Sequence, residues 1–146
     1  MTENGRNRFF RRILVGYDGS PSSQKALEAA LAIADTLGSA VEVLSVIRPP
    51  EPSTSTELNA VLDDAREHYE KAHRKIAQAA AANGTRLDTD VKIGHPAEQI
   101  IQRAELGRVD LIVLGHRGVS KFENLIMGSV SERVLAYAHC PVLVTR

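Results

Sequence analysis

The chain has 146 residues, of which 43% are hydrophobic and 25% are charged, and its formal net charge is zero. This length and composition are typical of one compact domain with a continuous apolar core, and they argue against a largely disordered or membrane-embedded chain. Because the charge is balanced, the chain lacks a general attraction to nucleic acid or to an anionic membrane, and an anion site would have to be built locally.

Cysteine content and the chain's start bear on location. Cys140 is the single cysteine, which excludes an internal disulfide and a thiolate-rich zinc site and favours a reducing cytoplasm. The apolar stretches are too short to cross a bilayer, and the first dozen residues lack the apolar segment of a signal peptide. Residues 1–11 are polar and rich in arginine, so we expect a flexible arm there and a single domain over 12–146. We therefore expect a cytoplasmic protein that binds neither nucleic acid nor membrane.

The first expected element is a short apolar strand over 12–17, and the DGSP turn that follows it leads into a helix. Ser20 is expected to cap this helix, with Pro21 at its first position, where a missing N–H group costs nothing. The helix should run to Leu37, because its apolar residues have helical spacing and Gly38 supplies a stop. A second strand is expected over 40–47.

The middle of the chain predicts a loop, a long helix and an edge strand. Three prolines within residues 48–56 predict a surface loop. From Leu58 onward, apolar residues at steps of three and four predict a helix that ends at Asn83-Gly84 and packs on the sheet. Apolar and polar residues alternate over 87–93, which predicts a strand with one face toward water, at a sheet edge.

The last third predicts two helices and two strands. His95-Pro96 opens a helix that Gly107 closes, and the apolar run over 110–115 predicts a central strand covered on both faces. A helix over about 129–138 and a strand over 141–145 complete the chain. This order predicts an α/β fold: a doubly wound, five-stranded parallel sheet in the order 3-2-1-4-5 with helices on both faces. Ligands bind such sheets where the strand order reverses, beyond the first and fourth strands.

The segment after the fourth strand is rich in glycine. It reads GHRG at 115–118, and after nine more residues Gly128-Ser129 opens the last helix. Glycines let the backbone approach a phosphate, and a helix N-terminus offers free N–H groups and the positive end of its dipole. Arg117 and Lys121 add positive charge, and a serine hydroxyl can donate to a phosphate oxygen. The segment therefore favours a polyphosphate ligand.

A second explanation of the same residues needs no ligand. The glycines would serve turns, and Ser129 with Glu132 would form a capping box at the start of the last helix. Asp18, likewise, could be a turn residue whose carboxylate binds nearby backbone. The local chemistry leaves both explanations of the glycine-rich segment open, whereas for Asp18 we favour a ligand contact because it follows a strand at the expected switch point.

Several motifs together resemble a known family. The pattern G-x2-G-x9-G-S, formed by Gly115, Gly118, Gly128 and Ser129, resembles the nucleotide-binding signature of ATP-binding universal stress proteins. The likeness extends to ILVGYDGSPSSQKAL, GHPAEQII and MGSVSERVLAYAHCPVLV, and so covers nearly all of residues 12–146. The resemblance implies an adenine nucleotide alpha hydrolase-like fold and ATP as the ligand, with Mg²⁺ or Mn²⁺ bound through the phosphates.

The resemblance also implies which residues contact the nucleotide. Near the first two strands, Gly16 would lie at a strand end, Asp18 beside the adenine and ribose, and Val46 against the adenine through its backbone. The ribose and α-phosphate would be wrapped by Gly115, His116, Arg117 and Gly118. The outer phosphates would be held by Gly128, Ser129, Val130 and Ser131.

Three functions are consistent with these residues. We expect a binding module whose ATP occupancy alters its conformation, dimer or partner contacts in a stress response. An alternative is a slow ATPase or phosphotransfer enzyme that uses Asp18 or His116 as a base with a divalent ion. A third possibility is a protein for another adenine nucleotide, such as cyclic AMP. The P-loop, dinucleotide and nucleophile-elbow motifs are absent, which disfavours the standard enzymes that carry them.

The last strand predicts an assembly. It should lie at a sheet edge, where Val142, Leu143 and Val144 leave apolar side chains and unpaired backbone groups exposed. A two-fold antiparallel pairing would satisfy both copies at once, and the family resemblance implies the same homodimer.

Overall fold

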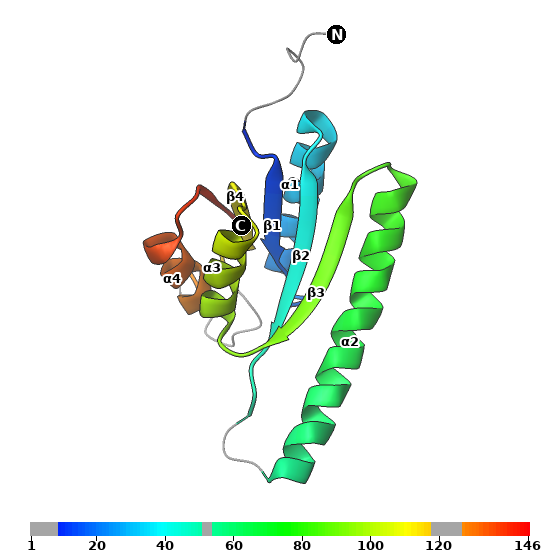
Figure 1. Cartoon of the computed structure of the whole chain (residues 1–146), viewed down its shortest axis with the longest axis vertical. Coiled ribbons are helices and arrows are strands. Elements are labelled where there is room, and N and C mark those ends of the chain that lie inside the picture. The colour runs from blue at the N-terminus through cyan, green and yellow to red at the C-terminus, as the bar shows by residue number, and fades with distance from the viewer. Residues whose placement is uncertain (1–8, 51–53, 118–126) are drawn as a thin grey trace.

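Five parallel strands form a single sheet with helices on both faces (Figure 1). The computed structural model describes residues 9–50, 54–117 and 127–146. The strands are β1 (Arg12–Gly16), β2 (Ala40–Ile47), β3 (Leu87–Ile93), β4 (Leu111–Gly115) and β5 (Val142–Thr145). The helices are α1 (Pro21–Leu37), α2 (Ser55–Ala82), α3 (Pro96–Leu106) and α4 (Ser129–Tyr137). The spatial order β3-β2-β1-β4-β5, with every pairing parallel, confirms the predicted fold class.

Successive residues of β1 supply two separate apolar cores, one on each face of the sheet. Ile13 and Val15 pack with α1, whereas Leu14 between them packs with α3. All three side chains are at most 1% exposed. Burial of each stabilises the fold by about 1.5–3 kcal/mol relative to exposure, and this double coverage holds the carboxyl end of β1 in place.

The α1 helix begins and ends at the residues that the sequence predicts. Its N-cap is Ser20, whose Oγ accepts a hydrogen bond from the Ser23 N–H at 3.1 Å, and Pro21 takes the first position. Gly38 ends the helix in the left-handed region, with φ of 71°, which a residue with a Cβ adopts only at a cost. Both ends of α1, and with them the turn that precedes it, are therefore fixed by local interactions.

The α2 helix begins earlier than expected, inside the segment interpreted as a proline-rich loop. Thr54 is its N-cap and forms a capping box with Glu57: the threonine side chain accepts from the Glu57 N–H, and the glutamate accepts from the Thr54 N–H. These two contacts satisfy backbone donors that a helix start leaves free, so the helix extends to Ser55. It lies along β2 and β3 on the same side of the sheet as α1 (Figure 1).

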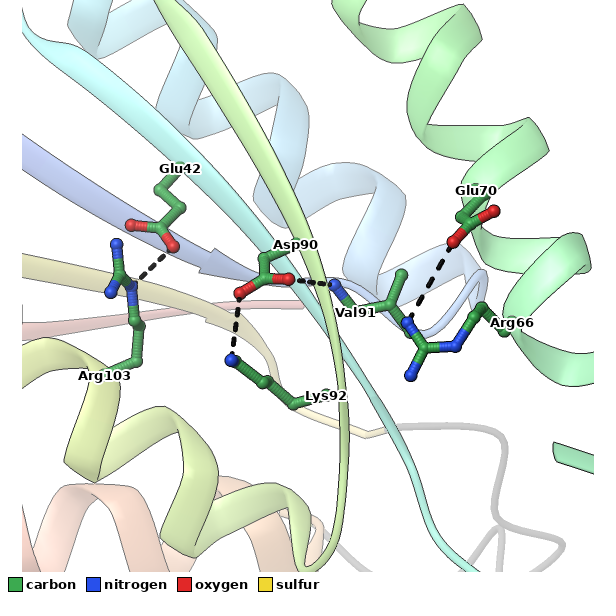
Figure 2. Close-up of polar contacts among 7 residues, drawn as sticks. All are labelled: Glu42, Arg66, Glu70, Asp90, Val91, Lys92 and Arg103. Atoms are coloured by element: carbon green, nitrogen blue, oxygen red, sulfur yellow. Dashed lines mark hydrogen bonds and ion pairs between the residues drawn. The ribbon is translucent and has the colours of Figure 1, made fainter. Parts of the chain in front are cut away.

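The face of β3 that points away from α2 is polar, as predicted for an edge strand. Beside it, Glu42 of β2 forms an ion pair with Arg103 of α3, with Oε1 and Nε 2.6 Å apart (Figure 2). On β3 itself, Asp90 lies 3.5 Å from Lys92 and accepts a hydrogen bond from the Val91 N–H at 2.8 Å. The pair between Glu42 and Arg103 therefore ties α3 to the sheet next to a surface that no helix covers among the described residues.

The described part of the expected N-terminal arm contacts the domain. The N–H groups of Arg11 and Arg12 donate to the two carboxylate oxygens of Asp110, each at 2.9 Å, and Phe10 packs against the core on the α1 side. Residues 1–8, where most of that arm was expected, lie outside the described residues. Within the described ranges, no helix is long and apolar enough to cross a membrane.

Candidate functional site

The carboxyl end of β1 is the point where the strand order reverses. Pairing of β1 with β2 stops at Gly16 and Leu44, yet β2 continues to Ile47. On the other side β4 extends to Gly115, beyond its last pairing with β1 at Val113. We call this position, beyond Gly16 and between the ends of β2 and β4, the switch point. Backbone groups at the ends of both neighbouring strands are left without a β1 partner there, which suits a ligand.

Asp18 lies just after β1, in the turn that leads into α1. Its Oδ1 accepts a hydrogen bond from the Ser20 N–H at 2.9 Å, and its own N–H donates to the Ser23 hydroxyl at 3.4 Å. The interpretation of Asp18 as a turn residue is therefore confirmed. Its other oxygen, Oδ2, has no hydrogen-bond partner among the described residues, so the same carboxylate can also accept from a ligand.

Val46 belongs to the part of β2 that extends past β1. Its side chain is half-buried and packs against the core on the α3 side. Its backbone lies beyond the last pairing of β1 with β2, at Leu44. An N–H or C=O group in this position can bind the edge of a planar base in the way that a neighbouring strand would.

At the end of β4, Gly115 makes a close approach to the first turn of α1. A Cβ at this position would lie 2.6 Å from the carbonyl carbon of Ser22. Contact between two backbones therefore requires this glycine, with or without a ligand.

His116 follows, and both of its ring nitrogens have partners. Nδ1 lies 3.2 Å from the Ser22 hydroxyl and 3.2 Å from the Thr145 carbonyl, and Nε2 accepts from Arg117 Nε at 3.0 Å. Because Nε2 accepts, Nδ1 carries the proton and donates to the carbonyl. His116 thus joins β4, α1 and β5, and it would have to leave a partner before acting as a base.

The start of α4 differs from the predicted capping box. The N-cap is Gly128, not Ser129, and within the part of the chain that the structure describes no side chain caps the helix. The Gly128 N–H donates to the His116 carbonyl at 2.6 Å, and the Glu132 N–H donates to the Gly128 carbonyl at 3.0 Å. These contacts set the helix start one residue earlier. Because glycine has no side chain, the first backbone N–H groups of α4 remain available to an anion.

The two serines in the first turn of α4 are placed differently. Ser131 is 4% exposed, and its hydroxyl donates to the Gly115 carbonyl at 2.7 Å. Ser129 is exposed and, with Val130, lines a pocket of about 310 Å³ between the starts of α3 and α4. The Ser131 hydroxyl therefore supports the β4 terminus, whereas the Ser129 hydroxyl is open to the surface.

The structure thus brings most of the predicted site residues to one end of the sheet. Gly16, Asp18 and Val46 surround the end of β1, and hydrogen bonds link the segment 115–117 to Gly128 and Ser131. Gly118 and Lys121 lie outside the described residues. No group of three His, Cys, Asp or Glu side chains that could hold a metal ion occurs in the part of the chain that the structure describes.

Two residues beside the switch point were not among the sequence-derived candidates. Ser45 and His73 are 1% and 2% exposed and hydrogen-bond to each other at 2.8 Å. The sequence alone assigns no role to His73 or to Ser45. The spacing of His73 was the available signal, because His73 lies four residues after Tyr69 and three before Ile76, both on the apolar face of the helix.

Comparison with known proteins identifies the family. The model of the universal stress protein family matches residues 9–146. The chain belongs to this family. It is 35% identical to the universal stress protein YxiE of Bacillus subtilis, over 94% of this chain and 99% of the relative. The solved structure of UspA from Lactobacillus plantarum aligns with a TM-score of 0.90 and 30% identity, covering 96% of this chain and all of that one.

Two further universal stress proteins of solved structure carry adenine nucleotides. One is in complex with cAMP and aligns with a TM-score of 0.71 at 23% identity, over 93% of this chain and 97% of that one. Another, from Archaeoglobus fulgidus, is in complex with dAMP and aligns with a TM-score of 0.66 at 20% identity, over 94% of this chain and 99% of that one. At these identities the likeness to this universal stress protein is one of fold.

Proposed function

We propose that this universal stress protein binds ATP at the switch point, as a binding module of the cytoplasmic stress response. The observation that carries the proposal is the placement of two unsatisfied polar groups at one end of the sheet. These are the Asp18 Oδ2 atom and the first turn of α4: the first has no partner, and the second has no side-chain cap, among the described residues. A carboxylate suits hydroxyl and amino donors of a nucleoside, and a helix N-terminus suits phosphates.

Each part of the nucleotide has its expected partners in this proposal. Asp18 and the Val46 backbone contact the adenine and ribose, and 115–118 contact the ribose and α-phosphate. The outer phosphates lie against Gly128, Ser129, Val130 and Ser131, of which Ser131 contributes only its backbone N–H, since its hydroxyl binds Gly115. A Mg²⁺ or Mn²⁺ ion would be held through the phosphates. The cAMP and dAMP complexes of two family members support the adenine class, and the free helix start favours a triphosphate over a monophosphate.

Calorimetry with ATP, AMP and cAMP tests the proposal. We expect Gly128→Val to weaken ATP on the order of tenfold or more, about 1.4 kcal/mol, because a branched side chain would stand where phosphate meets the helix start. Ser129→Ala should weaken ATP by a smaller factor and leave AMP unchanged. Its matched control is Ser55→Ala, which alters the first residue of a different helix and should leave ATP affinity as it is.

A second pair of variants tests the nucleoside end. Asp18→Asn keeps an oxygen for the Ser20 N–H but removes the charge, and it should weaken ATP, AMP and cAMP alike, whereas the exposed Asp35→Asn should weaken none. Wild-type protein that binds none of the three nucleotides would overturn the proposal. Equal loss of ATP and AMP affinity in Gly128→Val would show that the outer phosphates do not bind at the start of α4.

We also propose that two copies associate through β5. This strand lies at the edge of the sheet, and Leu143 on it is 38% exposed. Light scattering should give the mass of a dimer for the wild type and of a monomer for Leu143→Lys, since two lysines would face each other at an antiparallel contact. A Leu143→Lys protein that remains a dimer would place the interface elsewhere.

A further inference from the structure

The α2 helix places a buried imidazole behind the switch point. His73 is 2% exposed, and the only other helix position of α2 that is fully buried among the described residues is Ala80. Burial lowers the pKa of His73 from its ordinary value, against the opposing charges of Asp90 on β3 and Glu70 on α2. The imidazole is therefore neutral at pH 7, with one nitrogen that donates and one that accepts.

A directional chain of hydrogen bonds runs from His73 to the end of β1. The Ser45 hydroxyl donates to the Tyr17 carbonyl at 2.6 Å, so its single proton is committed to that bond. His73 Nε2 lies 2.8 Å from the same hydroxyl oxygen and must therefore donate to it. The Tyr17 N–H donates to the Leu44 carbonyl at 2.9 Å. Both polar groups of the Tyr17 backbone are thus held by β2, and one of them is held indirectly by α2.

The residues in this chain of hydrogen bonds directly precede two proposed ligand contacts. Tyr17 comes immediately before Asp18, and Ser45 comes immediately before Val46. The Tyr17 carbonyl belongs to the peptide whose N–H is that of Asp18, so fixing this carbonyl fixes the plane from which the Asp18 side chain departs. The hydroxyl of Ser45 likewise restrains β2 where it no longer pairs with β1.

Two tyrosine rings lie beside the same imidazole. The ring centroids of Tyr17 and Tyr69 each lie 6.4 Å from that of His73. Burial raises the pKa of Tyr69, and the charge of Asp18 raises it further. The α2 helix therefore contacts Tyr17, the residue directly before Asp18.

We propose that His73 is a positioning residue for the nucleoside end of the site: acting through Ser45 on the Tyr17 carbonyl, it sets the direction in which Asp18 and the Val46 backbone meet the adenosine group. The inference rests on the proposed nucleotide function and extends it to α2, a helix to which that proposal assigns no contact with the nucleotide. It predicts that His73 controls affinity for the base and ribose and has no effect on the contribution of the phosphates.

Three single variants separate positioning from general stability. In H73Q the side-chain amide can place an N–H group where Nε2 stands, whereas in H73N the shorter amide cannot reach Ser45. S45A breaks the same chain at its centre. With adenosine and ATP as probes in calorimetry, we expect H73N and S45A each to weaken both ligands by about three- to tenfold, and H73Q to weaken them by less than about twofold. The double variant H73N/S45A should lose no more than either single variant, because both remove one pathway.

Each outcome decides the inference. Equal weakening of adenosine and ATP in H73N, with rescue in H73Q, supports it. A lower melting temperature in H73N with unchanged adenosine affinity, measured where both proteins are folded, would reduce His73 to a structural residue. Loss in H73Q equal to that in H73N would also overturn it.

Two further arms keep the test decisive. Should H73N not fold, S45A is compared with S45T, which retains the hydroxyl; equal adenosine affinity in those two proteins overturns the inference. Wild-type protein that binds neither adenosine nor ATP would instead overturn the proposed nucleotide function, and the inference with it.

Discussion

The close approach of Gly115 to the backbone of α1 yields a sharp stability prediction. In Gly115→Ala the added Cβ would lie 2.6 Å from both the carbonyl carbon and the Cβ of Ser22, and 2.8 Å from its carbonyl oxygen. These atoms belong to the first turn of α1, which cannot rotate away as a side chain can. Either β4 or α1 must shift, together with the contacts that His116 makes to Ser22 and Thr145.

Gly16→Ala provides a matched control. Its added Cβ would lie 2.6 Å from Leu114 Cδ2 and 3.2 Å from Ile100 Cδ1, which are the ends of flexible side chains. Neither glycine has a positive φ, so backbone strain is not a factor in either variant. Overpacking of a core costs about 1–3 kcal/mol. We place Gly115→Ala at about 2–3 kcal/mol and Gly16→Ala at least about 1 kcal/mol below it, because only the first displaces backbone.

Urea unfolding of the two variants at 25 °C is the assay, with thermal unfolding as a second readout. For a domain of this size, 1 kcal/mol lowers the melting temperature by about 2–4 °C, so Gly115→Ala should melt about 4–12 °C below the wild type. Equal unfolding free energies for the two alanine variants would refute the reasoning, since it depends on the difference between a backbone and a side-chain neighbour. A Gly115→Ala protein as stable as the wild type would show that α1 yields freely at Ser22.

Three further predictions concern single contacts. Burial lowers the folded-state pKa of His73 below its ordinary value of about 6.5, so on acidification the unfolded chain takes up a proton first. The wild type should therefore lose stability relative to H73Q below about pH 6.5, by at most about 1.4 kcal/mol per pH unit. Urea midpoints that change with pH equally in the two proteins would contradict this. Thr54→Ala should cost about 1 kcal/mol and increase amide exchange in the first turn of α2, whereas Ser55→Ala should do neither; equal exchange in both variants would show that the capping box has no role. Arg103→Met should lower the free energy of unfolding by about 1 kcal/mol, because Glu42, whose side chain is 18% exposed, loses its partner. Adding Glu42→Leu to the same protein should recover that loss. If it does not, the loss comes from packing of the aliphatic part of Arg103.

Elements whose limits depend on adjacent residues were predicted closely from the sequence. Ser20, Pro21 and Gly38 define α1 because capping and the left-handed stop act within a few residues. The start of α2 was wrong although its signal was local as well: Thr54 and Glu57 have capping-box spacing, but the prolines before them favoured a loop.

Contacts between distant residues could not be predicted in the same way. The start of α4 depends on the hydrogen bond from the Gly128 N–H to the His116 carbonyl, and no residue next to Gly128 in the sequence indicates that partner. The burial of His73 depends on a hydroxyl from β2, and the partners of the His116 ring come from α1 and β5. In each case a polar group becomes structural because the fold supplies a partner, and that partner is visible only in three dimensions.

The two edges of the sheet differ in a way that limits how large an assembly can grow. At β3 the carboxylate of Asp90 occupies the Val91 N–H and also holds Lys92, so a backbone donor of this edge is used within the strand and charges stand beside it (Figure 2). Strand β5 presents Leu143 and apolar neighbours instead. A sheet that can be extended at both ends stacks into open fibres, whereas one with a single open end is finished once two such ends have met. The charges on β3 therefore disfavour strand pairing at that edge, so the association that we propose through β5 would close at two chains.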